Sequence, residues 1–96
     1  MSEYIFLMHD DASPGDQAWG PYIKTLQKNG FFEGGSAIGG GICTRKTGRT
    51  PPISAHLTGY IRVNASSLEQ AKSLLIGNPH FEANGTVEIR ELPRTD

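Results

Sequence analysis

Hydrophobic residues fall along the chain in short runs, and the spacing within three of these runs is that of β-strands. Residues 4–8 are apolar without a break, which is typical of a strand that is buried on both faces. Residues 56–65 alternate between apolar and polar side chains, and residues 86–92 do the same. Alternation directs one set of side chains toward a core and the other set toward the opposite face of a sheet. The pattern therefore predicts three strands, the last two with one polar face.

The polar faces of the two alternating strands carry ionisable groups. In residues 56–65, the apolar face holds Leu57, Ile61 and Val63. The opposite face of that strand holds His56, Thr58, Tyr60 and Arg62. In residues 86–92, Glu88 and Arg90 lie opposite the apolar residues Val87 and Ile89. If helices cover the apolar faces, these polar groups point away from the helices.

Two segments have helical spacing. For the first, Ser13 is a candidate N-cap, Pro14 suits the first helical position, and Asp16 follows at the capping-box spacing. The apolar residues that then recur at helical spacing are Ala18, Trp19, Tyr22, Ile23 and Leu26. Proline removes a helical hydrogen bond and clashes with the preceding turn, so we expect a kink at Pro21 or a restart of the helix there.

The second predicted helix follows the last residues of the 56–65 strand. Ser66 and Glu69 have the S-x-x-E spacing of a capping box, and Gly77 is typical of the residue that ends a helix. The buried stripe of this helix consists of Leu68, Ala71, Leu74 and Leu75. Residues 78–85 are then expected to be a loop, in which His80 is an anchor more readily than a base.

Residues 34–43 (GGSAIGGGIC) hold five glycines among apolar residues. A flexible linker would be polar, and a phosphate-binding loop would end in Lys-Ser or Lys-Thr, so a strand fits better. Glycine within a strand indicates that another backbone or a ligand comes close. Cys43 ends this run and is expected to be a buried, unreactive thiol. Residues 44–55, which include three basic residues, are expected to be a loop.

The resulting order is β-α-β-β-α-β, which is the ferredoxin-like split β-α-β pattern with an antiparallel sheet and both helices on one face. A length of 96 residues suits a single domain over residues 1–96. The uncovered sheet face would carry apolar side chains from the first two strands, and such a patch rarely stays exposed on a monomer. We therefore expect a homodimer formed through the open sheet face, with a barrel-like interior or cleft between the copies.

Charge and cysteine content narrow the class of protein. The net charge is −1 and the pI about 6.3, so no basic field favours nucleic acid or a membrane surface as a partner. The cations of residues 44–55 are expected to be solvated. The single cysteine cannot form an internal disulfide, and residues 4–8 are too short for a signal peptide or a membrane span. We expect a cytosolic protein. The histidine and cysteine spacings match no metal site, so neither a metal nor another cofactor is expected.

His9 and His56 are the candidate catalytic bases. A neutral imidazole beside a carboxylate could act as a general base near pH 7, and two aspartates follow His9 directly. The alternative for His9 is a solvated turn, and His56 could equally lie at an open mouth without a role.

The candidate ligand-binding residues are Tyr22, Tyr60, Arg62, Glu88 and Arg90. An arginine at a partly buried sheet face needs a partner, which could be a carboxylate or phenolate ligand. The alternative is an internal ion pair with Glu88 or with the neighbouring Glu91. Tyr22 fits the core by its spacing, but its hydroxyl could also be a donor to a ligand.

Several segments together resemble one known family. These are YIFLMHDD, AWGPYIKTLQKNG, FFEGGSAI, the block GYIRVNASSLEQAKSLLIGNPHF and the closing GTVEIRELP. From about Tyr4 to Pro93 the chain resembles the YCII-related family, and within it the DGPF-type branch, although it lacks the DGPF motif. The resemblance implies a dimeric α+β barrel of ferredoxin-like type. Some members carry a His–Asp pair proposed for acid/base chemistry on ring compounds, and Tyr22 stands where that histidine would be.

Two functions follow as hypotheses. The first is a cofactor-free lyase or isomerase acting on a small cyclic or aromatic acid, with His9 or His56 moving a proton and the arginines holding the anion. The second is a non-catalytic dimeric module that binds a metabolite or a protein.

Overall fold

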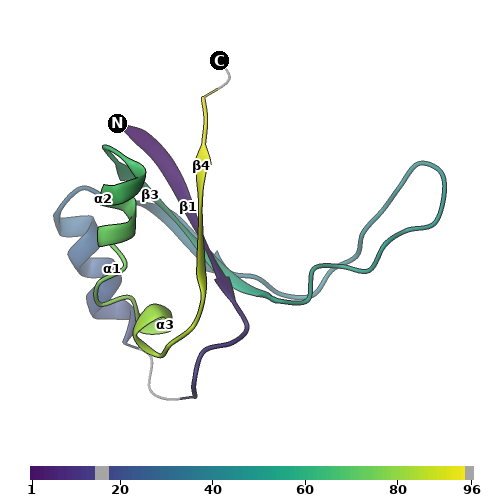
Figure 1. Ribbon diagram of the computed structural model, residues 1–96, viewed down its shortest axis with the longest axis horizontal. Coiled ribbons are helices and arrows are strands. Elements are labelled where there is room, and N and C mark those ends of the chain that lie inside the picture. Colours follow the sequence, from purple (N-terminus) through teal and green to yellow (C-terminus); the bar gives the residue numbers. More distant parts are fainter. Residues whose placement is uncertain (15–17, 95–96) are drawn as a thin grey trace.

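The computed structural model of the chain describes residues 1–14 and 18–94, and these form an α+β fold. Its elements in chain order are β1 (Ser2–His9), α1 (Trp19–Lys28), β2 (Phe32–Ala37), β3 (Leu57–Ala65), α2 (Leu68–Ser73), α3 (Pro79–Glu82) and β4 (Val87–Leu92). The strands make one sheet in the order β2-β3-β1-β4, and every neighbouring pair is antiparallel. The helices cover one face of this sheet (Figure 1). Within the described residues, no helix is long and apolar enough to cross a membrane.

The core lies between the helices and the two central strands. Phe6 of β1 and Val63 of β3 are fully buried there, and Tyr22 and Leu26 of α1 pack against them. The alternation predicted for residues 56–65 is confirmed, because every second residue of β3 from Gly59 to Ala65 is buried. The strand pattern is thus a good guide to the inner face of this sheet.

The prediction that residues 4–8 are buried on both faces is wrong. Tyr4, Phe6 and Met8 are buried, whereas Ile5 and Leu7 between them are only half-buried. Ile5 and Leu7 point to the sheet face that carries no helix, which we call the open face. Its other members, paired across the strands with these two, are Tyr60, Arg62, Glu88 and Arg90. Apolar side chains at the centre of the open face are therefore flanked by charged ones.

Helix α1 begins later than predicted. It starts at Trp19, and Ala18 makes no side-chain capping bond, so Ser13 is not its N-cap. Asp16, the other half of the predicted capping box, lies outside the described residues. Because α1 starts at Trp19, Pro21 lies in its first turn, where a missing N–H costs no helical hydrogen bond. The helix thus begins two residues before Pro21 and continues through it, whereas a restart at Pro21 itself was one of the two alternatives expected.

The second helix is capped one residue later than predicted. Ser67, not Ser66, is the N-cap of α2, and its hydroxyl accepts a hydrogen bond of 3.1 Å from the backbone N–H of Gln70. The side chain of Gln70 in turn accepts from the backbone N–H of Ser66. The loop predicted for residues 78–85 contains a short helix, α3, whose cap is Asn78.

The strand predicted over residues 34–43 is confirmed only in its first part. Strand β2 ends at Ala37, and residues 38–56 form a long excursion without helix or strand, which we call the arm (Figure 1). Cys43 lies on the arm and is only half-buried, so the prediction of a buried thiol is wrong. Within β2, a Cβ atom added at Gly35 would come within 2.7 Å of the carbonyl oxygen of Tyr60, so the close approach of β3 requires glycine there.

Candidate functional site

The end of β1 brings His9 next to a carboxylate from β4. The Nε2 atom of His9 lies 3.0 Å from Oε1 of Glu88, and these residues are 79 positions apart in the sequence. An irregularity in the pairing of β1 with β3 falls between Met8 and His9, and irregularities of this kind re-aim the side chain that follows. The His9 side chain is 25% exposed, so it is accessible to a ligand while held by its partner.

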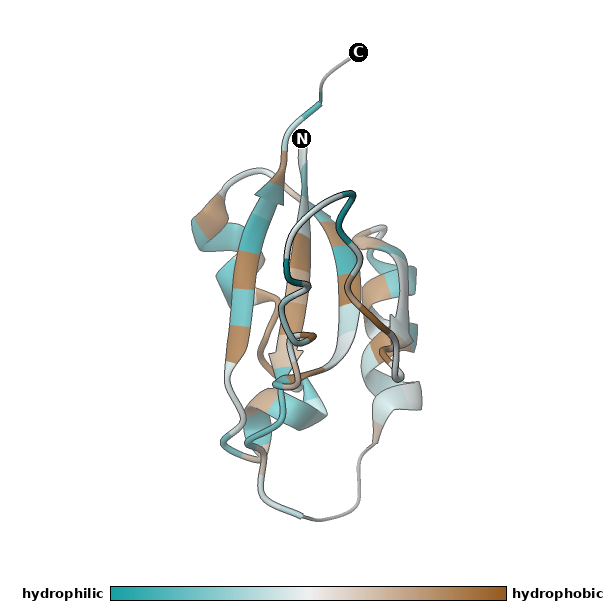
Figure 2. Cartoon of the chain, turned by 90° about the vertical axis from the view of Figure 1, so that its right-hand side faces the viewer, coloured by the Kyte–Doolittle hydropathy of each residue, from teal (hydrophilic) through white to brown (hydrophobic). Residues whose placement is uncertain are grey.

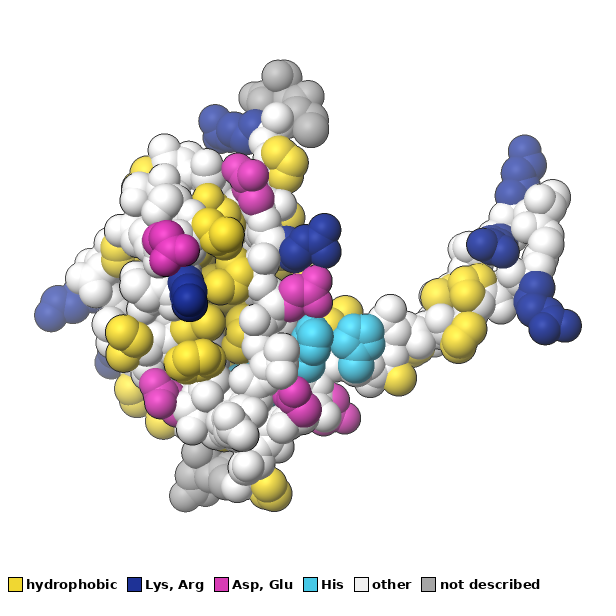
Figure 3. Space-filling model, viewed as in Figure 1, with side chains coloured by type: hydrophobic (Ala, Val, Ile, Leu, Met, Phe, Trp, Pro, Cys, Tyr) yellow, Lys and Arg dark blue, Asp and Glu magenta, His cyan; other side chains and the backbone are white. Residues whose placement is uncertain are grey.

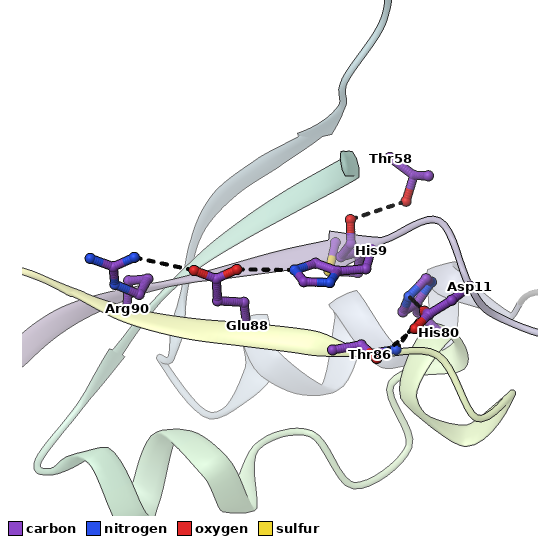
Figure 4. A network of polar contacts seen from close by, with 8 residues as sticks. His9, Asp11, Thr58, His80, Thr86, Glu88 and Arg90 are labelled. Carbon is purple, nitrogen blue, oxygen red and sulfur yellow. Dashed lines mark hydrogen bonds and ion pairs between the residues drawn. The ribbon is translucent and has the colours of Figure 1, made fainter. Parts of the chain in front are cut away.

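Glu88 also binds a cation on its own strand. Nη1 of Arg90 donates to Oε2 of Glu88 over 3.2 Å, so each carboxylate oxygen has one partner (Figure 4). The hydrogen bond from His9 and then that from Arg90 hold the pKa of Glu88 below its ordinary value of 4.5. The Glu88 carboxylate is therefore ionised near neutral pH and acts only as an acceptor.

His56 completes the group. Its ring lies edge-on to the ring of His9, with the ring centroids 4.9 Å apart. The carbonyl oxygen of His56 accepts a hydrogen bond from the backbone N–H of Asp10, which joins the end of the arm to the turn after β1. The structure thus brings together His9, His56, Glu88 and Arg90, which we call the His9 cluster. Histidine, acidic and basic side chains border one another on the surface where the arm leaves the body (Figure 3).

The geometry of the His9 cluster fixes the roles of the imidazole nitrogens. An ionised carboxylate can only accept a hydrogen bond, so Nε2 of His9 is protonated and its N–H donates to Oε1 of Glu88. In the neutral ring, Nδ1 then has the free lone pair. A carboxylate that orients a histidine in this way leaves the second nitrogen to exchange protons with a ligand. His9 therefore has the arrangement of a general base.

The other predicted ligand-binding arginine lies outside the cluster. Arg62 donates to Oε2 of Glu3 over 2.7 Å and to the backbone oxygen of Glu33 over 3.0 Å. Arg90 has the partner Glu88, which is the ion-pair alternative that the sequence left open. The partner of Arg62 is Glu3, which was not predicted. Tyr60 lies on the same face, opposite Leu7 in the pairing of β1 with β3.

Tyr22 does not belong to this group. It is buried on the helix side of the sheet, and its hydroxyl donates to the carbonyl oxygen of Leu74 over 2.7 Å. Burial raises the pKa of its hydroxyl above the ordinary value of 10.0. The structure therefore places Tyr22 in the core, which is the alternative that its helical spacing favours.

A second polar group at the same end of the sheet was not predicted. The carboxylate of Asp11 accepts hydrogen bonds from the backbone N–H of Thr86, over 2.7 Å, and from its hydroxyl, over 2.5 Å. These bonds hold the pKa of Asp11 below its ordinary value of 3.8. They also tie the turn after β1 to the start of β4 (Figure 4).

His80 lies under this turn and is almost fully buried. Its Nε2 atom is 3.8 Å from Oδ1 of Asp11, too far for a hydrogen bond, and has no hydrogen-bond partner among the described residues. The prediction of a loop anchor agrees with its burial in α3, although the segment is helical.

Sequence reasoning also missed a pocket of about 470 Å³ between α1 and strands β2 and β3. Its walls are mainly apolar, and His80 is the histidine that lines it. The residues that line it include Met8, Trp19, Ile23, Phe32, Ile61 and His80. The signal that could have found it is the amphipathic pattern of α1, which turns Trp19 and Ile23 toward the sheet above two glycine-containing strands. Among the described residues, no group of three or more His, Cys, Asp or Glu side chains could hold a metal ion.

No protein-family model matches this sequence, and no match is found among curated proteins.

Proposed function

We propose that the chain is a ferredoxin-like domain of the YCII-related type that forms a homodimeric α+β barrel through its open face. The sheet order and the antiparallel pairing of every strand support this assignment. Ile5 and Leu7 at the centre of the open face support the dimer, because a second copy would remove their apolar surface from water. The interior between two such faces would be a cleft bordered by the His9 cluster.

Within this cleft, the protein would act as a cofactor-free acid/base enzyme on a small cyclic or aromatic acid. The observation that carries this proposal is the 3.0 Å contact between His9 and Glu88. It orients the ring, keeps a proton on Nε2 and leaves Nδ1 as the proton acceptor. Arg90 is bonded to Glu88 through Nη1, so its other N–H groups can bind the carboxylate of a substrate. Lyase and isomerase reactions that begin by removing a proton beside a carboxylate fit these roles.

The test is a turnover assay on small aromatic and cyclic carboxylic acids, chosen first by their effect on thermal unfolding. Removing a general base lowers a rate by roughly 10²- to 10⁴-fold, so we expect a loss of that size for His9→Ala. Glu88→Gln keeps a hydrogen-bond acceptor but removes the charge, and we expect a smaller loss. Lys24→Ala, at an exposed position of α1 on the helix side of the sheet, is the matched control. Turnover that His9→Ala leaves unchanged would contradict the catalytic role.

The pocket beneath α1 favours a second candidate, a non-catalytic module that binds a small apolar metabolite. Pockets of this volume with mainly apolar walls and few polar groups are typical of ligand sites. Trp19, which is the only tryptophan of the chain, lines this pocket. Its fluorescence therefore reports occupancy directly. Saturable quenching by an aromatic compound, without turnover and unchanged in His9→Ala, would favour the binding module over the enzyme.

A further inference from the structure

The arm, residues 38–56, stands on the same side of the sheet as the open face (Figures 1 and 2). Nineteen consecutive residues there have neither helix nor strand. Structureless loops longer than about 12–15 residues are uncommon in small domains and usually have a function of their own. The length of the arm therefore needs an explanation outside the packing of this domain.

The contacts of the arm give no such explanation within the chain. At its base, the arm is hydrogen-bonded to β3 and to the turn after β1. Farther out, the hydrogen bonds among the described residues join the arm to itself. Sγ of Cys43 lies 3.6 Å from the carbonyl oxygen of Pro52, and Arg45 donates to the carbonyl oxygen of Arg49 over 2.9 Å. Among the described residues, the outer arm is therefore held by hydrogen bonds within itself and not by hydrogen bonds to the sheet or helices.

The apolar side chains of the arm are exposed. Ile42 is 83% exposed, Ile53 39% and Ile38 37%. Contiguous exposed apolar groups mark surfaces that bind another molecule. Figure 3 shows hydrophobic side chains along the arm and a hollow between the arm and the body.

The glycines of the arm point the same way. A Cβ atom added at Gly39, Gly40 or Gly41 would meet nothing within 4 Å, and none of these glycines has a positive φ. Gly35 differs, because β3 of the same chain excludes a side chain there. Nothing among the described residues requires glycine at these three positions, whereas close approach by another chain would require it.

Charge identifies the other chain. The arm holds three of the nine basic residues, Arg45, Lys46 and Arg49, and none of the ten acidic residues. The rest of the chain therefore has six basic and ten acidic residues, a net charge of −4, against +3 on the arm. A second copy of this chain offers a body of opposite net charge to the arm, and the apolar centre of its open face, Ile5 and Leu7, to the same residues of the first copy.

We propose that the arm of each copy grips the other copy of the chain. A copy seated on the open face lies between that face and the arm, and two-fold symmetry places the second arm around the first copy. The apolar side chains of the arm are then buried against the partner, and the cations reach its acidic body. This inference rests on the dimer of the proposed function, to which it adds the element that holds the copies together.

The first test is the dimer dissociation constant from sedimentation equilibrium. The double variant Ile42→Ser/Ile53→Ser removes apolar contacts from both arms of the dimer. We expect its dimer dissociation constant to be at least about tenfold larger than that of the wild type. The matched control is Ile76→Ser, because Ile76 is 77% exposed but lies between α2 and α3 on the helix side. The control is expected to dissociate like the wild type. Circular dichroism checks that each variant is folded.

The second test uses Cys43, the only cysteine, as the attachment point for a benzophenone photocrosslinker. Chains with natural ¹⁴N that carry benzophenone are mixed with ¹⁵N chains that carry no benzophenone. After irradiation, mass spectrometry identifies the crosslinked peptides. We expect peptides that join the arm of one isotope to the body of the other. A wild-type chain that stays monomeric at high micromolar concentration overturns the proposed dimer and the grip together. A dimer that the arm substitutions leave unchanged, or crosslinks within single chains only, overturns the grip alone.

Discussion

Glu88 holds Nε2 of His9 at 3.0 Å and Nη1 of Arg90 at 3.2 Å, so one carboxylate links the end of β1 to the middle of β4. The same residue sets both the orientation of the candidate base and the number of N–H groups that Arg90 has left for a ligand. Substitutions of Glu88 therefore act on stability and on the site at once.

The first prediction concerns acid unfolding. The pKa of Glu88 is lowered in the folded chain by His9 and Arg90, so the unfolded chain binds the proton more readily. Its contribution to stability is present above pH 4.5, the ordinary pKa of the group, and is lost as the pH falls through the lower folded pKa. Urea unfolding between pH 7 and pH 3 is expected to show a shallower acid decline in Glu88→Gln than in the wild type. Equal slopes in the two proteins would contradict the assignment.

A second prediction separates the two serines before α2. Ser67→Ala removes the acceptor for the backbone N–H of Gln70 and is expected to lower the free energy of unfolding by about 1 kcal/mol. Ser66→Ala leaves that bond in place, since Ser66 takes part through its backbone N–H. Chemical denaturation of both variants measures the difference. A larger loss in Ser66→Ala would restore the capping box predicted from the sequence.

The third prediction compares two glycines. Gly35→Ala forces its Cβ atom to within 2.7 Å of the carbonyl oxygen of Tyr60, and overpacking of this kind costs about 1–3 kcal/mol. Gly20→Ala, at a position with nothing within 4 Å, is expected to be neutral or slightly stabilising in α1. Thermal unfolding distinguishes the two, and a Gly35→Ala chain as stable as the wild type would show that β2 can move away from β3.

The fourth prediction tests the place of Tyr22 in the core. Tyr22→Phe leaves the carbonyl oxygen of Leu74 without its side-chain donor, and we expect a loss of about 1–2 kcal/mol at neutral pH. Because burial raises the pKa of Tyr22, the wild type loses stability as the pH rises above 10 and the unfolded chain gives up the proton first. The variant has no hydroxyl to titrate, so its unfolding free energy is expected to fall less steeply in alkali.

Local periodicity was a sound guide where one face of an element is buried. The alternation of β3 is confirmed residue by residue. The register is strongly determined, because a shift of one position would expose the side chains of Ile61 and Val63 to solvent. The ends of the elements were predicted less well. Ser66 and Ser67 are chemically identical, and the choice of cap depends on the turn that leaves β3. Gly35 and the glycines at 39–41 belong to the same glycine-rich segment of the sequence, but of these four only Gly35 has a neighbouring strand within 4 Å.

The four members of the His9 cluster were all among the predicted residues, but Tyr22 and Arg62 lie outside it, and the contacts within it were not predicted. Parity along β3 and β4 places Tyr60, Arg62, Glu88 and Arg90 on one face, as expected. The bond between His9 and Glu88 joins residues far apart in the sequence, and it depends on the register of β1 with β4. Two aspartates next to His9 made a nearer carboxylate seem sufficient, yet Asp11 binds Thr86 instead. Register is a tertiary property, which periodicity alone does not give.

Glu3 of β1 and Leu92 of β4 are paired directly opposite one another, at the end of the sheet away from the arm (Figure 1). A short covalent linker could therefore connect the first strand to the last without disturbing the hydrogen-bonded ladder. New ends could then be opened among Gly39, Gly40 and Gly41, where a cut breaks no strand pairing. Such a circular permutant would keep the whole sheet contiguous while turning most of the arm into a free tail attached to β3.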